Sequence, residues 1–264
     1  MKTAILSVGT EVLFGQIINT NTVYLSQQLN LLGFDVMYHY TVGDNSCRLS
    51  EMIELAFRDC DFIITTGGLG PTEDDLTKET VCETLHDQLV MHEPSLQALH
   101  EIAKKRGRTM TKNNYKQAMM PSRAVVFDND AGSAPGFALS EGGKTVICMP
   151  GPPREMTRMW QRSVRPYLEK LQTAVIFYKT LRLFGIGESS LETELLDLID
   201  AQSDPTIATY AKEGECSLRI ASKRGSLEEA QSAVDEVIEK ISDRVGEYIY
   251  SCLLYTSPSP RDVE

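Results

Sequence analysis

The sequence predicts an α/β protein built on a parallel sheet with helices on both faces, followed by a smaller α+β domain. Three observations lead to this prediction. Apolar runs of strand length alternate with helical patterns from residue 1 to residue 171. Glycine-rich loops follow several of those runs directly. A second unit with its own pattern begins at residue 173 and extends to residue 250.

The first part of the chain alternates strands with helices. Strands are expected at residues 4–8, 34–42 and 61–66. The first helix between them ends at Gly33, a residue that tolerates the positive φ of a helix C-terminus. The next helix carries apolar residues at helical spacing and begins after Asp44, Asn45 or Ser46, each of which can cap it.

The remaining elements follow from the same patterns. Residues 77–120 are expected to be rich in helix, with Pro94 in the first turn of one helix. Two further strands, at residues 137–139 and 145–149, flank a glycine turn, and a helix follows from residue 154 to about residue 171. The second unit is expected to contain a strand, a helix, two strands and a long helix, at residues 175–183, 189–199, 206–210, 216–222 and 227–245.

The charge balance excludes several classes of partner. The 264 residues include 26 Lys and Arg against 37 Asp and Glu, which gives a formal net charge of −11. Such a chain has no general attraction to nucleic acid or to anionic membranes. It also lacks an apolar run of the about 18 residues needed to cross a bilayer. The six cysteines stand far apart without metal-ligand spacing, which is typical of reduced, mostly buried thiols. We expect a cytoplasmic protein.

Residues 252–264 continue neither the pattern of the first unit nor that of the second. They have no periodicity and few apolar residues, and their sequence resembles translated sequencing-adapter read-through. A disordered linker is the alternative interpretation. We therefore expect a non-native tail that contributes nothing to the fold.

The main candidate site is the loop that leaves the third strand, residues 65–77. Open α/β sheets bind ligands at the carboxyl ends of their strands. Gly67, Gly68 and Gly70 let the backbone approach a ligand closely and present N–H groups to an anion. Asp74 and Asp75 can cap the next helix or bind a metal ion that offsets phosphate charge. An ordinary glycine turn is the alternative, but the combination of glycines, threonines and three consecutive acids favours a nucleotide-phosphate site.

Two other loops are expected at the same edge of the sheet. Gly9 and Glu11 follow the first strand, and Asp44 and Asn45 follow the second. Each carboxylate alone is commonly a cap or a solvated residue, but their shared position predicts that Glu11, Asp44 and Asp75 converge. Loops at residues 131–136 and 150–153 can form a wall of the pocket, although plain turn chemistry explains each of them equally well.

These motifs, in this order, resemble those of the CinA (competence-damage-inducible) family over residues 1–250. The matching segments are Ser7-x-Gly9-x-Glu11, Gly15-x-Ile17-x-Asn19-Thr20-Asn21, Gly43-Asp44-Asn45, residues 65–77, Asn113-Asn114-x-x-Gln117-Ala118, Ala134-Pro135-Gly136-Phe137 and Pro150-Gly151-Pro152-Pro153-x-Glu155-Met156. The resemblance implies a three-layer molybdopterin-binding-type domain of the MogA/MoeA kind, followed by a small KH-type domain. Many members carry a further nicotinamide-mononucleotide deamidase domain, which would start where this chain ends, so that activity is not expected here.

The resemblance further implies a metal-dependent ADP-ribose pyrophosphatase that releases AMP and ribose 5-phosphate. In related adenylyl-transfer domains the T-G-G-x-G-x-x-x-x-D motif supplies a catalytic aspartate, which corresponds to Asp75, and a second one corresponds to Asp44. We expect Mg²⁺ or Co²⁺ at Asp74 and Asp75, and activation of the attacking water by Asp44 or Asp75. The expected catalytic residues are Asp75, Asp44 and Glu11, and the expected ligand-binding residues are Gly9, Asn45, Thr66, Gly67, Gly68, Gly70, Pro71, Ser133, Gly151 and Pro152.

Three other functions stay open at this point. The same motif fits adenylyl transfer to a pterin or pterin binding, and a non-catalytic module could instead sense a nucleotide for a partner deamidase. The third open function is RNA binding by the second domain. A nucleic-acid-binding KH domain needs a G-x-x-G loop, however, and the nearest candidate in this chain reads Gly185-Ile186-Gly187-Glu188. The acidic balance also argues against it. We expect the second domain to mediate interaction or dimerisation, and the protein to be a homo-oligomer, a dimer.

Overall fold

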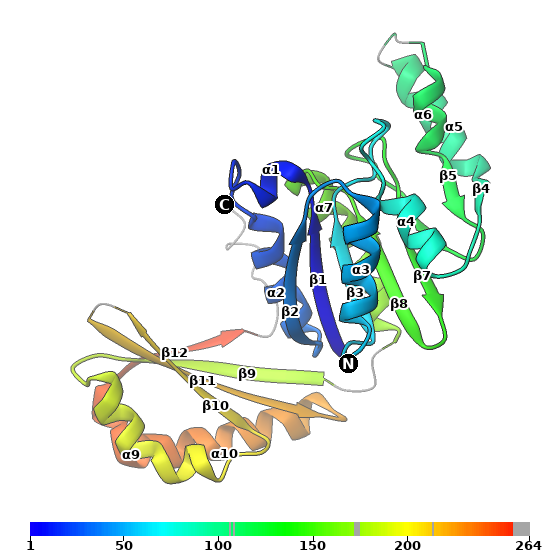
Figure 1. The fold of residues 1–264 in the computed structure, drawn as a ribbon. Coiled ribbons are helices and arrows are strands. Elements are labelled where there is room, and N and C mark those ends of the chain that lie inside the picture. The colour runs from blue at the N-terminus through cyan, green and yellow to red at the C-terminus, as the bar shows by residue number, and fades with distance from the viewer. Residues whose placement is uncertain (106, 108, 172–174, 213, 256–264) are drawn as a thin grey trace. The chain divides into compact units, whose positions relative to one another are not determined.

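The computed structural model describes residues 1–105, 107, 109–171, 175–212 and 214–255. The chain forms two compact units (Figure 1). The first comprises Met1–Asn30 and Phe34–Leu171, and the second is formed mainly by residues from 175 onward. Within these residues, no helix has the length and apolar character that a membrane crossing requires.

The first unit is built on a six-stranded sheet in the order β2-β1-β3-β8-β7-β6. Its strands are β1 (Lys2–Val8), β2 (Asp35–Val42), β3 (Phe62–Thr66), β6 (Val125–Phe127), β7 (Gly136–Glu141) and β8 (Lys144–Met149). The first four strands of this order pair in parallel, whereas β7 and β6 are antiparallel. The prediction of a parallel sheet is therefore correct for four strands. The strand β7 differs because Gly142 and Gly143 close a tight hairpin to β8, and such a short loop joins only antiparallel neighbours. β6 then pairs antiparallel with β7.

Helices cover both faces of this sheet in three layers (Figure 1). They are α2 (Thr20–Leu31), α3 (Ser46–Ala56), α4 (Thr77–Thr84), α7 (Pro153–Met159) and α8 (Arg165–Glu169), whereas the short α1 (Thr10–Leu13) buries no residue and follows the end of β1. Ala4 and Leu6 of β1 pack with Leu49 and Ile53 of α3 in one apolar cluster. Ile5 lies between them and is fully buried on the opposite face, because successive strand residues point to opposite sides.

Local signals account for the ends of several helices. Asn45 caps α3, since its Oδ1 accepts a hydrogen bond from the Arg48 backbone N–H at 3.0 Å. Gly33 follows α2 with a φ of 83°, as predicted. The helix expected from residue 154 to about 171 is interrupted by a π-helical turn, η1 (Trp160–Val164). Pro166 in the next turn has no N–H to donate, so the regular α-helical ladder cannot run through it.

The region between α4 and β6 contains two further helices and a small separate sheet. The helices are α5 (Glu93–Lys105), with Pro94 in its first turn, and α6 (Lys112–Lys116). The strands β4 (Leu89–Met91) and β5 (Met119–Pro121) pair antiparallel. These three-residue strands and β6 were not predicted, because runs so short show no alternation of apolar and polar residues.

The second unit is a four-stranded antiparallel sheet in the order β10-β11-β9-β12 with helices packed on it. Its elements are β9 (Val175–Leu183), α9 (Glu188–Asp200), β10 (Thr206–Lys212), β11 (Glu215–Arg224), α10 (Leu227–Val245), the 3₁₀ turn η2 (Gly246–Tyr248) and β12 (Ile249–Tyr255). Phe177 and Leu181 of β9, Leu191 of α9, and Val234 and Ile241 of α10 belong to one apolar core. This α+β arrangement agrees with the prediction for every element from β9 to α10.

The structure corrects the expectation for the start of the C-terminal tail. Cys252 pairs with Leu181 and Tyr255 with Tyr178, so residues 252–255 extend β12 along β9. Backbone pairing at a sheet edge needs no alternation of side chains, which is why composition alone did not reveal the strand. Residues 256–264 of the expected tail lie outside the described residues.

The first prediction concerns the start of α10. The Ser226 side chain accepts a hydrogen bond from the Glu229 backbone N–H at 3.2 Å and so caps this helix. We expect Ser226→Ala to lower the free energy of unfolding by about 1 kcal/mol, measured by urea denaturation. Ser232→Ala, at an exposed position inside the same helix, is the control and should cause no loss. Equal losses in the two variants would contradict the assigned cap.

Candidate functional site

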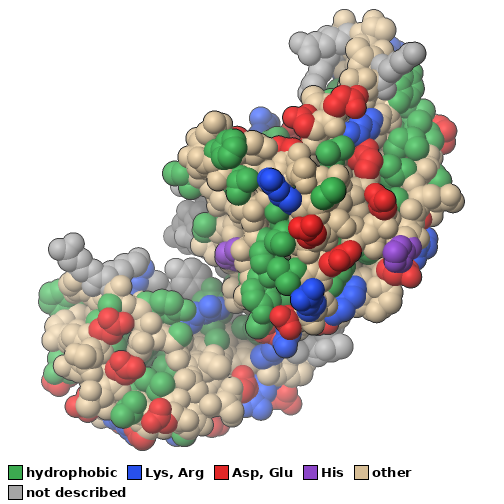
Figure 2. All heavy atoms as spheres, viewed as in Figure 1, with side chains coloured by type: hydrophobic (Ala, Val, Ile, Leu, Met, Phe, Trp, Pro, Cys, Tyr) green, Lys and Arg blue, Asp and Glu red, His purple; other side chains and the backbone are tan. Residues whose placement is uncertain are grey.

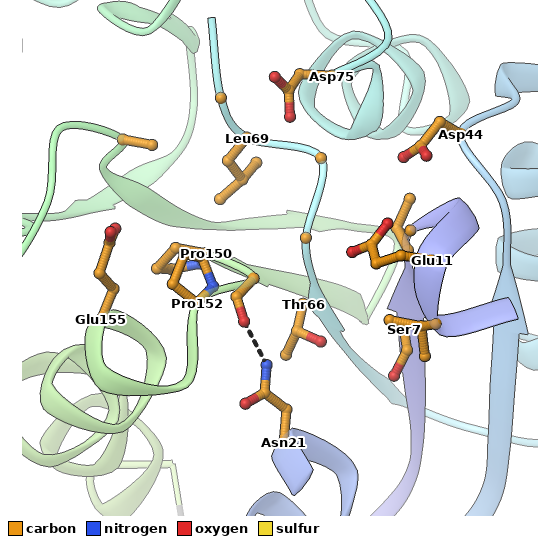
Figure 3. A pocket seen from close by; sticks show the side chains of 18 of the residues that line it. Ser7, Glu11, Asn21, Asp44, Thr66, Leu69, Asp75, Pro150, Pro152 and Glu155 are labelled. Atoms are coloured by element: carbon orange, nitrogen blue, oxygen red, sulfur yellow. Dashed lines mark hydrogen bonds between the residues drawn. The ribbon is translucent and has the colours of Figure 1, made fainter. Parts of the chain in front are cut away.

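A cavity of about 520 Å³ opens at the carboxyl ends of the parallel strands (Figure 3). The residues that directly follow β1, β3 and β8, namely Gly9, Gly67 and Pro150, line it, as does Asp44 after β2. The sequence predicted a site at this edge of the sheet, and the structure brings these loops together around one space.

Almost all the predicted site residues line this cavity. They are Gly9, Glu11, Asp44, Thr66, Gly67, Gly68, Gly70, Pro71, Asp74, Asp75, Ser133, Gly151 and Pro152. Asn45 is the exception, and its expected role in ligand binding is not supported. Its side chain is used as the N-cap of α3, which the sequence had offered as the alternative role for this position.

The glycine loop after β3 is held against the neighbouring strand ends. The Gly67 N–H donates to the Met149 carbonyl at 3.0 Å, and the Thr77 hydroxyl donates to the Gly67 carbonyl at 2.9 Å. Gly67 has a φ of 104°, and a Cβ at this position would overlap the carbonyl oxygen of Val8. Gly68 follows with a φ of 67°. A side chain at Gly67 is therefore excluded both by backbone conformation and by space.

Asp75 is fixed by its own loop. Its Oδ2 accepts hydrogen bonds from the Thr72 backbone N–H, at 2.9 Å, and from the Thr72 hydroxyl. The carboxylate lies directly over the Cα of Gly70, where any side chain would collide with it. A hydrogen bond with Thr72 lowers the pKa of neighbouring Asp74, and the charge of Lys116 acts in the same direction. Both carboxylates thus lie at the cavity, and Asp74 is held in its ionised form.

Two lysines support this loop from outside the cavity. The Lys116 ammonium donates to the carbonyls of Asp75, at 2.6 Å, and of Thr72, at 3.1 Å, and it pairs with Glu79 at 3.6 Å. Lys78 is only 3% exposed and donates to the Lys116 carbonyl at 2.7 Å. Neither lysine lines the cavity. Their charges stabilise the loop that carries Asp75 rather than a ligand.

Asp44 and Glu11 approach from the first two strands. Asp44 Oδ2 accepts from the backbone N–H of Thr10, at 2.9 Å, and from its hydroxyl, at 2.8 Å. The Asp44 N–H donates back to that hydroxyl at 3.3 Å. This reciprocal pair joins the β1 and β2 loops. Glu11 is exposed, and its carboxylate projects into the cavity (Figure 3).

The charged residues that line the cavity are all acidic. They are Glu11, Asp44, Asp74, Asp75 and Glu155, and the lining contains no Lys, Arg or His among the described residues. No group of three or more His, Cys, Asp or Glu in the described part of the chain is placed to hold a metal ion. Mg²⁺, however, is commonly held by one or two carboxylates together with substrate phosphates and water. The hard oxygen donors of Asp74 and Asp75 fit such an ion.

Neutral polar side chains complete the lining. The Asn21 side-chain amide donates to the Gly151 carbonyl at 2.7 Å (Figure 3), and that of Gln117 donates to the Ser133 hydroxyl at 3.1 Å. Asn21, Gln117 and Glu155 were not among the predicted site residues, although each lies in a segment that matched the family pattern. No pattern in the sequence indicated the contact of Lys116 with the Asp75 loop or that of Lys78 with the Lys116 carbonyl.

Both units match known families. A family model described as a probable molybdopterin binding domain matches residues 4–170, and a model of the damage-inducible protein CinA KH domain matches residues 178–251. The fold and the cavity define an α/β domain with a ligand site at its strand ends, followed by a KH-type domain. The chain belongs to the CinA family.

Several known proteins are similar in sequence to this chain. The chain is 49% identical over 251 residues to a putative competence-damage inducible protein of Clostridioides difficile, and 50% identical over 250 residues to a CinA-like protein of Dictyoglomus turgidum. It spans 60% and 61% of the length of these relatives, which each cover 95% of it. A solved CinA structure from Thermoplasma acidophilum, described as of unknown function, matches 62% of this chain and 96% of its own with 31% identity and a TM-score of 0.57.

Gly67 provides a test of how tightly the loop is packed. We expect Gly67→Ala to lower the free energy of unfolding by about 2–5 kcal/mol, because it adds both backbone strain and overlap with Val8. Gly142→Ala is the matched control, since Gly142 also has a positive φ, 56°, but a Cβ added there would meet no atom within 4 Å. It should cost only about 1–2 kcal/mol. Equal losses in denaturant titrations would exclude the steric contribution.

Lys78 provides a test by pH. Burial lowers the pKa of its ammonium from 10.5 to about 8. Between these values the folded chain has lost a proton that the unfolded chain still holds, so stability rises with pH. Relative to Lys78→Met, the wild-type chain should gain up to about 3 kcal/mol between pH 7.5 and pH 10.5. Urea titrations at several pH values measure this gain, and the exposed Lys104→Met is the control. A difference that is constant or falls with pH would contradict the shift.

Proposed function

We propose that the first domain is a metal-dependent nucleotide pyrophosphatase that hydrolyses ADP-ribose to AMP and ribose 5-phosphate. One observation carries the proposal. The cavity combines a glycine loop, suited to an anion, with five carboxylates and no basic side chain among its described lining residues. A phosphate ligand can occupy such a space only with a cation that offsets the combined negative charge. A diphosphate ester bound with a divalent metal ion meets both requirements.

The glycine loop supports the binding of the diphosphate. Gly67, Gly68 and Gly70 line the cavity with backbone and no side chain, which lets phosphate oxygens approach the loop closely. The loop is already held by Met149, Thr77 and Lys116, so little further ordering is needed when a ligand binds. Pro150 and Pro152 form a rigid wall across the cavity (Figure 3).

Asp74 and Asp75 are the residues proposed to hold the metal ion. Mg²⁺ or Co²⁺, when bound there, supplies positive charge that stabilises the developing charge on the bridging and leaving oxygens. The low pKa of Asp74 keeps this ligand ionised in the neutral pH range. The support is the donor chemistry and the charge of the cavity.

A carboxylate has to orient the water that attacks phosphorus. Hydrolysis breaks one P–O bond of the diphosphate, adds a water oxygen to one phosphorus and leaves two phosphomonoesters. Asp75 Oδ2 is engaged by Thr72, and Asp44 Oδ2 is engaged by Thr10. Each residue keeps its second oxygen for water, and each is held at a fixed position. We therefore propose that Asp75 or Asp44 accepts the proton of that water, with Glu11 in a supporting role.

Two alternatives have their own support. The family model names a molybdopterin binding domain, which favours pterin binding or adenylyl transfer. A non-catalytic module that senses a nucleotide is the second alternative, because the same glycine loop and cavity could bind a nucleotide without turnover. RNA binding has weaker support, because Gly187 serves as the N-cap of α9 and no G-x-x-G loop is present at this position.

The test is AMP release from ADP-ribose by the purified chain. We expect release in the presence of Mg²⁺ or Co²⁺ and none after chelation with EDTA. Asp75→Asn should reduce the rate at least about 100-fold, because it removes a group that orients water and metal. The reaction is followed by chromatography of AMP and ribose 5-phosphate.

Asp200→Asn, on an exposed face of α9 in the second unit, is the matched control and should leave the rate unchanged. If the folded wild-type chain releases no AMP with either metal, the pyrophosphatase proposal fails. Nucleotide binding that persists in Asp75→Asn without turnover in the wild-type chain would point to the sensing module. Turnover of an adenylylated pterin instead would point to pterin chemistry.

A further inference from the structure

Gln117 is a buried polar residue with an unmet hydrogen-bonding requirement. Its side chain is 1% exposed. Its Nε2 donates to the Ser133 hydroxyl at 3.1 Å, whereas its Oε1 has no hydrogen-bond partner among the described residues. A buried acceptor without a partner destabilises the folded chain. A residue with such a cost at the wall of a ligand cavity is a candidate contact for the ligand.

Gln117 and Ser133 lie between two spaces. Both line the main cavity of about 520 Å³, and both also line an adjoining cavity of about 250 Å³. The adjoining cavity is formed by α5, by residues 109–111, by Asn114 and by these two side chains. The pair is therefore positioned at a wall that the two cavities share.

The chemistry of the pair suits a hydroxyl group. The Ser133 oxygen accepts from Gln117, so its own O–H can be donated to a ligand, while Gln117 Oε1 needs a donor. A hydroxyl group can both donate and accept a hydrogen bond. It can therefore pair with the Gln117 amide whether the amide oxygen or the amide nitrogen faces the ligand. Adjacent hydroxyls of a sugar ring match this arrangement better than a phosphate, which offers acceptors alone.

The strand order separates this pair from the apolar part of the cavity. The loop after β3 lies between α1, which follows β1, and the segment that precedes β7 and carries Ser133. On the α1 side the lining includes Val12, Ile17 and Ile18, and the last two are 53% and 86% exposed. Such side chains suit the faces of a nucleobase. The diphosphate loop stands between the two ends.

We propose that Gln117 and Ser133 form the subsite for the sugar that lies beyond the diphosphate, on the side away from the nucleobase. This inference rests on the proposed function, because it assigns one part of ADP-ribose to one part of the cavity. The nucleobase lies toward Ile17 and Ile18, the diphosphate at the glycine loop and the terminal ribose at Gln117. The subsite selects a nucleoside diphosphate that carries a sugar over one that ends at its phosphate.

The test compares two ligands that cannot be hydrolysed, α,β-methylene ADP-ribose and α,β-methylene ADP, by calorimetry in the presence of Mg²⁺. We expect the wild-type chain to bind the first more tightly. Gln117→Leu should weaken that binding about 5–10-fold, the equivalent of one hydrogen bond, and change the binding of the ADP analogue less than about twofold. Ser133→Ala, which removes little volume, should have the same selective effect.

Gln97→Leu, an exposed change of the same kind on α5, is the matched control and should alter neither affinity. Equal loss for both ligands in Gln117→Leu and Ser133→Ala would overturn the subsite, since the pair would then only shape the cavity. Unchanged affinity for both ligands would also overturn it, and either result would leave the proposed function intact. If the wild-type chain binds neither analogue, both the subsite and the nucleotide function are wrong.

Discussion

The ends of four parallel strands meet at one edge of the first domain, and the backbone of Gly67 lies in the narrow space between two of them. Its N–H donates to the Met149 carbonyl at the end of β8, and its Cα lies against the Val8 carbonyl at the end of β1. A side chain cannot enter this space. The chain is therefore forced to turn away from the sheet here, and the turn leaves a hollow lined by backbone groups. The loops that carry Glu11, Asp44 and Asp75 border the same hollow.

Charge is distributed in an unusual way around this hollow, and acidic side chains are also scattered over the visible face of the molecule (Figure 2). A site for phosphate commonly presents lysine or arginine to its ligand, but here the nearby lysines are used inside the protein. The Lys116 ammonium donates a hydrogen bond to the Asp75 carbonyl, and the buried Lys78 ammonium donates one to the Lys116 carbonyl at the end of α6. Among the described lining residues, the cavity keeps only carboxylates as charged groups. A metal ion would then act as the removable counter-charge, so that affinity for an anion depends on ion concentration.

Much of this arrangement could be predicted from the sequence, and the features that were not predicted share identifiable physical reasons. Local signals predicted the longer strands other than β12, Gly33 after α2 and the grouping of Asp44 and Asp75, because strand ends and glycine loops leave clear patterns. Asn45 was assigned to the ligand, although a position next to a helix start serves equally well as a cap. The contacts of Lys116 and Gln117 join segments far apart in the chain, and no local pattern encodes them. The pairing of β12 likewise depends on an open edge of β9.

Lys116 and Gln117 are consecutive residues at the end of α6, so a displacement of this helix end moves both together. Lys116 touches the Asp75 loop, and Gln117 lies between two cavities. A shift of Gln117 would therefore be transmitted to Lys116, whose ammonium holds the Asp75 carbonyl. The position of Gln117 at one part of the cavity is thereby linked, through a single peptide bond, to the position of the loop that carries the Asp75 carboxylate. Such a link between the two ends of the cavity requires neither a lid nor a domain movement, because Lys116 and Gln117 lie at the same end of one short helix.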